Sequence, residues 1–495
     1  MKTTITILIS SLYMTIHAQA QGDLTPGSAP VATMKTLEQL EPRVDVATLA
    51  GDVLSEVVIT NSGSYYLSGN LEVTKPNGIT IDAPGVTLDL GGFKVSWSSG
   101  TGEYGIKINF GMDRATVRNG TITGFDYGIF GQGADLLFEK LTASNCRICG
   151  ISTSSNSRVI DCSSLNNSGS GIQAAWGTSI TGCTVSSNQG DFGIRTQRGC
   201  MIANCTVSSN QCGDAIFAST GSIVKGCNVQ NNIGTGSSSQ GIYVNNGSIK
   251  DCVVSKNIGA GPDSYGISGS GSLSIDRCVV ADNKSNGIRG GGMSIISACS
   301  VSGNQGDYGI RGGIGSIIKG CSAYGNVGSG ASSYGIYTST RSSVIGCTAR
   351  SNSNTNSLST ASQGIGIYTG LGSSIRDCTA SRNQGDGICV SRYSLAVGNI
   401  SDFNGFNGDG AGIHVTQYGN RIEGNTVTSN DRGIDVDGLN NLIIRNSATV
   451  NGIEYDLGID NKVGTIITPP SSAAITGSTG GAGLGSTDPW ANFTF

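Results

Sequence analysis

The sequence predicts an all-β protein, a right-handed parallel β-helix solenoid of about 15 coils with an N-terminal cap. Three observations lead to this fold class. A unit like residues 179–194 recurs every 21 to 31 residues, each copy pairs a cysteine with an asparagine five residues later, and apolar positions change phase at fixed points. A fixed period of this size is typical of a solenoid, because each repeat buries its apolar side only by stacking on its neighbours.

Ten copies of the unit share the cysteine and the asparagine. The cysteines are Cys162, Cys183, Cys205, Cys227, Cys252, Cys278, Cys299, Cys321, Cys347 and Cys378. The asparagines are Asn167, Asn188, Asn210, Asn232, Asn257, Asn283, Asn304, Asn326, Asn352 and Asn383. Three later copies carry Asn399, Asn425 and Asn446 in the cysteine position. We therefore expect a column of stacked thiols at one corner, continued by a hydrogen-bonded asparagine ladder.

The spacing inside a unit predicts three short strands and three bends per coil. Gly193-Ile194 opens one strand, and Ile180, Cys183 and Val185 mark the apolar positions of the others. Inward residues of one strand are an even number apart, so the odd step from Ile180 to Cys183 indicates a corner. The change of phase at Asn188 indicates another. No helical period lies between these points.

This rhythm, over about residues 79–460, resembles the right-handed parallel β-helix repeat proteins of the pectate-lyase-like superfamily. It is similar to secreted bacterial members that include periplasmic copper-binding-like and carbohydrate-binding modules. The resemblance implies the fold and leaves the activity open, because the superfamily holds lyases, hydrolases, adhesins and inert scaffolds. The motif sets of polygalacturonase-like hydrolases and of pectate lyases are missing, so we do not carry over those activities.

Composition shifts predict the domain organisation. Lys2, an apolar run and Ala18-Gln19-Ala20 indicate a cleaved signal peptide, so we expect a secreted, periplasmic or cell-surface protein without a membrane span. The aromatic C-terminus is expected either to fold back onto the last coil, which we favour, or to be read by sorting machinery. The expected divisions are a signal peptide (1–20), a linker (21–33), an N-terminal cap (34–75), the β-helix (76–460) and a Ser/Gly/Pro-rich tail (461–495).

Composition also limits the partners and cofactors. A net charge of −4 argues against nucleic acid, which needs a basic surface. In-register strands point stacked cysteines the same way, so we favour free, inert thiols over disulfides. Cys146 and Cys149 form a lone C-x-x-C without a second pair at zinc spacing. We therefore expect no metal and no cofactor.

One outward column indicates a ligand-binding face. If the isoleucine of each Gly-Ile pair points inward, the next residue points outward. Aromatic rings and arginines along a flat face suit sugar rings and anionic sugars. The alternative is that these side chains only protect and solubilise the sheet. The candidate substrate-binding residues are Arg195, Phe217, Tyr243, Arg289, Arg311, Tyr337 and Tyr368.

The candidate catalytic residues lie in the C-terminal coils and are His414, Asp435, Asp386 and Asp409. Paired carboxylates a few ångströms apart are what glycoside hydrolysis requires, and a histidine beside them can move protons. The alternative is that His414 is a surface histidine with no catalytic role. We therefore predict a secreted β-helix that binds polysaccharide or cell-surface glycan, with cleavage left open. The alternative is a non-catalytic surface or matrix scaffold or adhesin.

Overall fold

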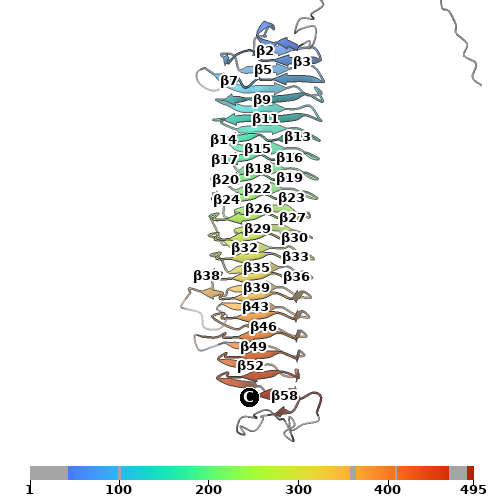
Figure 1. The fold of residues 1–495 in the computed structure, drawn as a ribbon, viewed down its shortest axis with the longest axis vertical. Coiled ribbons are helices and arrows are strands. Elements are labelled where there is room, and N and C mark those ends of the chain that lie inside the picture. The colour runs from blue at the N-terminus through green and yellow to red at the C-terminus, as the bar shows by residue number, and fades with distance from the viewer. Residues whose placement is uncertain (1–42, 99–101, 357–363, 407–409, 468–487, 495) are drawn as a thin grey trace, which may run out of the picture. The chain divides into compact units, whose positions relative to one another are not determined.

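The computed structural model describes residues 43–98, 102–356, 364–406, 410–467 and 488–494. The predicted signal peptide and linker lie outside these residues, as do residues 34–42 of the predicted cap. From Ser55 onward the chain winds through repeated coils, each with three short strands. Equivalent strands of successive coils pair in parallel, so they form three sheets that run along the stack (Figure 1). The predicted β-helix is confirmed.

Sheet 1 holds the strands that carry a Gly-Ile pair in most coils. Its strands are β2 (Ser55–Ile59), β5 (Asn77–Ile81), β8 (Gly102–Ile108), β10 (Phe125–Gly131), β12 (Cys149–Thr153), β15 (Ser170–Ala174), β18 (Phe192–Thr196), β22 (Asp214–Ala218), β26 (Gln240–Asn245), β29 (Tyr265–Ser270), β32 (Asn286–Arg289), β35 (Tyr308–Gly312), β39 (Tyr334–Thr338), β43 (Ile365–Thr369), β46 (Ile388–Val390), β49 (Ala411–Val415), β52 (Arg432–Val436) and β55 (Ile453–Leu457).

Sheet 2 follows sheet 1 in each coil. Its strands are β3 (Gly63–Tyr66), β6 (Val86–Asp89), β9 (Thr116–Thr123), β11 (Leu137–Ser144), β13 (Arg158–Ile160), β16 (Ser179–Thr181), β19 (Met201–Ala203), β23 (Ile223–Lys225), β27 (Ser248–Lys250), β30 (Ser274–Asp276), β33 (Ile295–Ser297), β36 (Ile317–Lys319), β40 (Ser343–Ile345), β44 (Ser374–Arg376), β47 (Leu395–Val397), β50 (Arg421–Glu423), β53 (Leu442–Ile444) and β56 (Lys462–Val463).

Sheet 3 completes each coil, and β9 and β11 run through both sheets 2 and 3. Its other strands are β4 (Leu71–Val73), β7 (Lys94–Trp97), β14 (Ser163–Leu165), β17 (Thr184–Ser186), β20 (Thr206–Ser208), β24 (Asn228–Gln230), β28 (Val253–Ser255), β31 (Val279–Ala281), β34 (Ser300–Ser302), β37 (Ser322–Tyr324), β41 (Thr348–Arg350), β45 (Thr379–Ser381), β48 (Ile400–Asp402), β51 (Thr426–Thr428), β54 (Ser447–Thr449) and β58 (Asn492–Thr494).

The remaining elements lie outside the three sheets or at their ends. They are β1 (Arg43–Asp45), the 3-10 turn η1 (Val46–Thr48), β57 (Ile466–Ile467), and two short parallel pairs, β21 (Gln211–Cys212) with β25 (Ile233–Gly234) and β38 (Val327–Gly328) with β42 (Ser353–Asn354).

The coils begin earlier than the sequence indicates. Strands β2, β3 and β4 pair in parallel with β5, β6 and β7, so residues 55–73 form a coil and not part of a separate cap. This segment lacks the Cys and Asn of the repeat, so its pattern of short strands is easily mistaken for a hairpin. Sheet 1 has 18 strands in the described part of the chain, against the expected figure of about 15 coils.

Each bend combines a residue with left-handed backbone conformation and, directly after it, an inward residue that stacks on its equivalents in the neighbouring coils, here called a ladder residue. We call the ten repeated cysteines and the ten repeated asparagines, which recur at the same place in each unit, the phased cysteines and the phased asparagines. At the corner between sheets 2 and 3, the residue before each phased cysteine has positive φ, such as Asn204 at 53° and Asp251 at 54°. At the corner between sheets 3 and 1, the residue before each phased asparagine does the same, as at Asp282 (56°). One left-handed residue turns the chain sharply, so the next side chain points inward out of step with the strand.

The asparagines that recur five residues after the cysteines form a second hydrogen-bonded ladder, at the corner between sheets 3 and 1, in addition to the ladder predicted for the cysteine corner. Asn304 donates its backbone N–H and side-chain Nδ2 to Oδ1 of Asn326, at 3.2 and 3.0 Å, and donates Nδ2 to the carbonyl of Val280 at 3.0 Å. The same contacts run from Asn167 to Asn451. The ladder therefore satisfies buried backbone groups at a bend where no strand pairing can do so.

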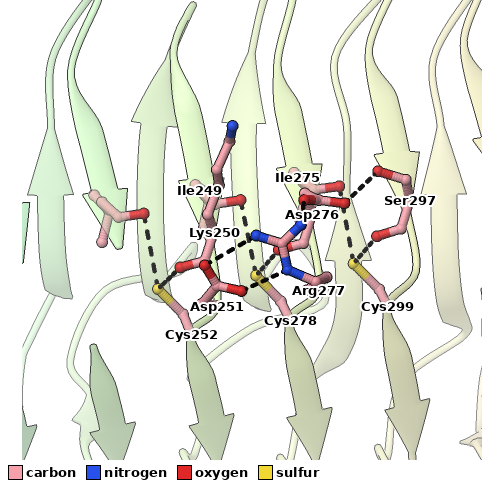
Figure 2. Close-up of polar contacts among 11 residues, drawn as sticks. Ile249, Lys250, Asp251, Cys252, Ile275, Asp276, Arg277, Cys278, Ser297 and Cys299 are labelled. Carbon is pink, nitrogen blue, oxygen red and sulfur yellow. Dashed lines mark hydrogen bonds and ion pairs between the residues drawn. The ribbon is translucent and has the colours of Figure 1, made fainter. Parts of the chain in front are cut away.

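The phased cysteines stack at the corner between sheets 2 and 3, as predicted. Figure 2 shows Cys252, Cys278 and Cys299 side by side, each thiol directed at backbone carbonyls. Cys278 Sγ lies 3.4 Å from the Asp276 oxygen and 3.8 Å from the Ile249 oxygen. All fifteen cysteines are buried free thiols. Beyond Cys378 the column continues through Asn399, as expected.

The C-terminal segment folds back onto the last coil. Strand β58 pairs with β54 and β57, and Asn492 accepts hydrogen bonds from the backbone and side chain of Asn446. Trp490 packs under Arg445, whose guanidinium carbon lies 4.1 Å from the ring centre. Asn492 therefore takes the place of the next ladder residue.

We expect Asn304→Ala to lower the free energy of unfolding by about 3 kcal/mol, because it leaves several buried donors and acceptors unpaired. Urea unfolding followed by circular dichroism measures the change. Ser300→Ala, an exposed change in the same coil, is the control and should shift stability by less than about 0.5 kcal/mol. Equal midpoints for the two variants would contradict the role given to the ladder.

Candidate functional site

The outer face of sheet 1 carries two neighbouring columns of side chains, because the glycine of each Gly-Ile pair faces inward with the isoleucine. A Cβ on Gly287 would lie 2.5 Å from Val301 Cγ1 and 2.3 Å from the Gly309 carbonyl oxygen. Only glycine fits such a close approach easily, although Ala215 takes the equivalent place in one coil. With two successive inward positions, the residues before the glycine and after the isoleucine both face outward.

The first column is the one predicted from the sequence. Its residues pair in register from coil to coil, so the expected alignment is confirmed. The aligned residues are Ser152, Gln173, Arg195, Phe217, Tyr243, Ser268, Arg289, Arg311, Tyr337, Tyr368, Cys389, His414 and Asp435.

The second column was missed by the sequence analysis. Its residues stand directly before the glycine, and strict alternation would place them inside. The pattern Tyr-Gly-Ile, which recurs with Tyr265, Tyr308 and Tyr334, is the signal that could have revealed it. Register places Tyr308 beside Tyr334 and Phe192 beside Asp214.

Four tyrosines from the two columns form a cluster on β35, β39 and β43, which we call the tyrosine patch: Tyr308, Tyr334, Tyr337 and Tyr368. The rings of Tyr337 and Tyr368 are nearly parallel, with centres 5.2 Å apart, and those of Tyr308 and Tyr334 are 5.6 Å apart. The guanidinium of Arg311 lies 4.8 Å from the Tyr308 ring centre. Burial raises the pKa of Tyr334 to about 12, so its phenol remains a neutral donor.

The other predicted binding residues extend this face toward the N-terminus. Phe217 stacks on Tyr243 with ring centres 5.2 Å apart, and Arg195 lies over Phe192 at 5.0 Å. Arg289 lies 5.8 Å from the Tyr265 ring centre. In both aromatic groups the rings cover one another along the column. The ring faces are therefore largely used within the protein, and ring edges, hydroxyls and guanidinium groups face outward.

An acidic cluster around His414 continues the same face, with Asp386 just before β46, His414 on β49, and Asp435 and Asp437 at the end of β52. His414 Nδ1 lies 2.9 Å from Oδ2 of Asp386, and its Nε2 lies 3.0 Å from Oδ2 of Asp437. The imidazole is about one-fifth exposed and Asp386 is almost buried, whereas Asp437 is exposed. Two of the predicted catalytic residues, His414 and Asp386, are therefore in direct contact.

The cluster is charged on both sides of the imidazole. Burial opposes charging of His414, but its hydrogen bonds and attraction to the carboxylates outweigh this and raise its pKa to about 9. An imidazolium donates from both nitrogens, which suits the two carboxylates. Burial also raises the pKa of Asp435, and the positive charge of His414 opposes that shift.

Asp435 lies beside His414 in the register of sheet 1 and accepts a hydrogen bond from Arg432 Nη1 at 2.9 Å. Arg432 also reaches Asp456 on the next strand, at 3.5 Å. Asp435, Asp437 and His414 each place one polar atom within 4.8 Å of the others. Asp409, the fourth predicted catalytic residue, lies outside the described residues.

The three-sheet coils and the continuous outer face define a parallel β-solenoid. The family model of the right-handed β-helix region matches residues 57–195 and 240–399, more than half of the chain. The chain belongs to the right-handed β-helix family. No curated protein sequence matches it. Among the described residues, no helix has the length and apolar character needed to cross a membrane.

Comparison with solved structures gives matches of low sequence identity and low TM-score. The A-module of a mannuronan C-5 epimerase from Azotobacter vinelandii is 14% identical, over 68% of this chain and 86% of that one, with a TM-score of 0.29. A tailspike protein of E. coli bacteriophage HK620, solved with a pentasaccharide, is 11% identical over 73% and 69%, with a TM-score of 0.28. A surface adhesin of Streptococcus pneumoniae is 12% identical over 54% and 82%, with a TM-score of 0.24.

Asp214, an acid of the second column, gives a prediction that depends on pH. Burial raises the pKa of Asp214 from 3.8 to about 6, although the backbone N–H of Gln240 stabilises its charged form. Above pH 6 the folded protein must hold a poorly solvated carboxylate, and below pH 4 this cost is absent. We expect Asp214→Asn to stabilise the protein by about 1 to 3 kcal/mol at pH 7 and by little at pH 4.

Urea unfolding at both pH values tests this expectation. Asp263→Asn, at an exposed position on the following coil, is the matched control and should change the midpoint little at either pH. A gain of the same size at pH 4 and pH 7 would show that the charge of Asp214 is not the cause.

Proposed function

We propose that the protein binds a polysaccharide along the outer face of sheet 1, with the tyrosine patch as its main contact. The observation that carries this proposal is the two-column arrangement, which gathers four tyrosines and Arg311 on three neighbouring strands. Stacked strands repeat every ~4.8 Å, so the same kinds of group recur at the scale of a sugar ring. A repeating ligand can meet such a face in several equivalent contacts.

The exposed groups favour hydrogen bonding over stacking. Because neighbouring rings cover each other, the patch offers phenol hydroxyls and a guanidinium more than free ring faces. Phenols donate and accept, and a guanidinium binds carboxylate or sulfate in a charge-assisted way. These groups suit sugar hydroxyls and acidic sugars, in agreement with the arginines Arg195 and Arg289 farther along the column.

The histidine cluster supports binding better than cleavage. Both nitrogens of His414 lie at hydrogen-bonding distance from carboxylates, and its pKa of about 9 keeps it protonated near neutrality. Such an imidazolium is a poor general base. Asp435, with its raised pKa, is the better acid candidate for cleavage. Export by the predicted signal peptide would bring the face into contact with extracellular or periplasmic glycans.

We expect the double variant Tyr337→Phe with Tyr368→Phe to bind polysaccharide about tenfold more weakly, because it keeps the stacked rings and removes two hydroxyls. A glycan array on the wild-type chain would select the neutral or acidic polysaccharide, and titration calorimetry would then compare the variants. Tyr324→Phe, an exposed tyrosine on sheet 3, is the control and should leave the affinity unchanged.

Equal affinities for the double variant and the control would place binding elsewhere. Failure of the wild type to bind any glycan would overturn the proposal and favour the alternative of a non-catalytic scaffold. Product analysis of the bound polysaccharide, with wild type and Asp435→Asn, decides whether the protein also cleaves it.

A further inference from the structure

Cys389 differs from the cysteines of the corner column. It lies on the outer side of β46 between Tyr368 and His414 in the register of sheet 1, yet it is only 3% exposed. The corner thiols each face backbone carbonyls, whereas the structure gives the Cys389 thiol no hydrogen bond within the described part of the chain. A buried thiol without a partner, directed at charged groups, needs an explanation.

The thiol converges with two other ligand-type groups. Cys389, Asp386 and His414 each place one donor atom within 4.8 Å of the others. The His414 nitrogen that faces Asp386 is Nδ1, at 2.9 Å. Around a tetrahedral zinc ion, bond lengths of about 2.0 to 2.3 Å place ligand atoms about 3.3 to 3.8 Å apart. Small side-chain adjustments would therefore bring the three atoms onto one ion.

The surroundings of these groups are those of a supported metal site. The second oxygen of Asp386, Oδ1, accepts a hydrogen bond from the backbone N–H of Ala411 at 2.8 Å, which fixes the carboxylate. The second nitrogen of His414, Nε2, lies 3.0 Å from Asp437. A histidine that binds a metal through one nitrogen commonly donates its other N–H to a carboxylate. Asp437 is already in that position.

We propose that Asp386, Cys389 and His414 bind a zinc-type divalent ion at the end of the tyrosine patch. Mixed oxygen, sulfur and nitrogen ligands suit Zn²⁺, whereas Ca²⁺ and Mg²⁺ prefer oxygen alone. Three protein ligands leave a fourth position open for water or a ligand on the face. No metal is expected from the sequence, because Cys146 and Cys149 lack a second pair at zinc spacing and Cys389 is not grouped there with Asp386 and His414.

The competing arrangement is a proton in place of the ion. A protonated His414 between two carboxylates satisfies the imidazole and both acids but leaves the thiol without a role. The two arrangements differ in one measurable property, the contact between Cys389 and the ion. A metal probe that reports sulfur coordination therefore separates them.

The experiment uses the reduced full chain after treatment with a chelator. Titration calorimetry with Zn²⁺ should give one ion per chain, and Co²⁺ should produce a sulfur-to-cobalt charge-transfer band in the near ultraviolet. Cys389→Ser should remove the band and weaken zinc binding by roughly 100-fold or more, and Asp437→Asn should weaken it by about 10- to 100-fold. Circular dichroism confirms that each variant is folded.

Cys212→Ser is the matched control, because Cys212 is also a buried thiol of the coils but lies far from the cluster in sequence and register. It should retain both zinc binding and the cobalt band. The proposal is overturned if the wild type binds no zinc, if bound cobalt shows no sulfur band, or if Cys389→Ser and Cys212→Ser bind zinc with equal affinity.

Discussion

The structure depends on how each coil turns its corners. A strand can satisfy its backbone groups through its neighbours, but a sharp bend cannot, and three bends per coil would leave many buried groups unpaired. The chain meets this constraint by placing a left-handed residue before a ladder residue whose side chain bonds the bend above and below. The regular outer face follows, because fixed corners keep every strand in register with the next.

The same constraint explains why the fold can be predicted from the sequence. Ladder residues must recur in every coil, so Cys183 with Asn188 and their equivalents mark the period directly. The odd step from Ile180 to Cys183 reveals the corner because the left-handed residue between them, Gly182, breaks the alternation. The inward isoleucines then give the first outward column. These features are local to one repeat and need no knowledge of contacts between repeats.

Other features depend on contacts that a single repeat does not show. The glycine of each Gly-Ile pair faces inward because it packs closely against the next strand and against a valine such as Val301. This inward glycine breaks the expected alternation, so the sequence does not reveal the second column, which contains Tyr308 and Tyr334. The first coil, residues 55–73, lacks the ladder residues, so the sequence predicts a cap there instead of a coil. His414 contacts Asp386 of the preceding coil and Asp437 of the following coil, so this cluster joins three successive coils through side-chain contacts. The sequence predicts that His414, Asp386 and Asp435 lie close together in the register, and the structure shows that His414 contacts Asp386 and Asp437 through its two ring nitrogens.

The self-contained ladders also have an evolutionary consequence. Each ladder residue bonds only the coils directly above and below it, so one whole unit can be duplicated or deleted while the joints on either side re-form unchanged. Unequal recombination between related units would then lengthen or shorten the outer face by whole steps. The length of the outer face becomes a quantity that gene rearrangement can tune, independently of the chemistry of any one coil.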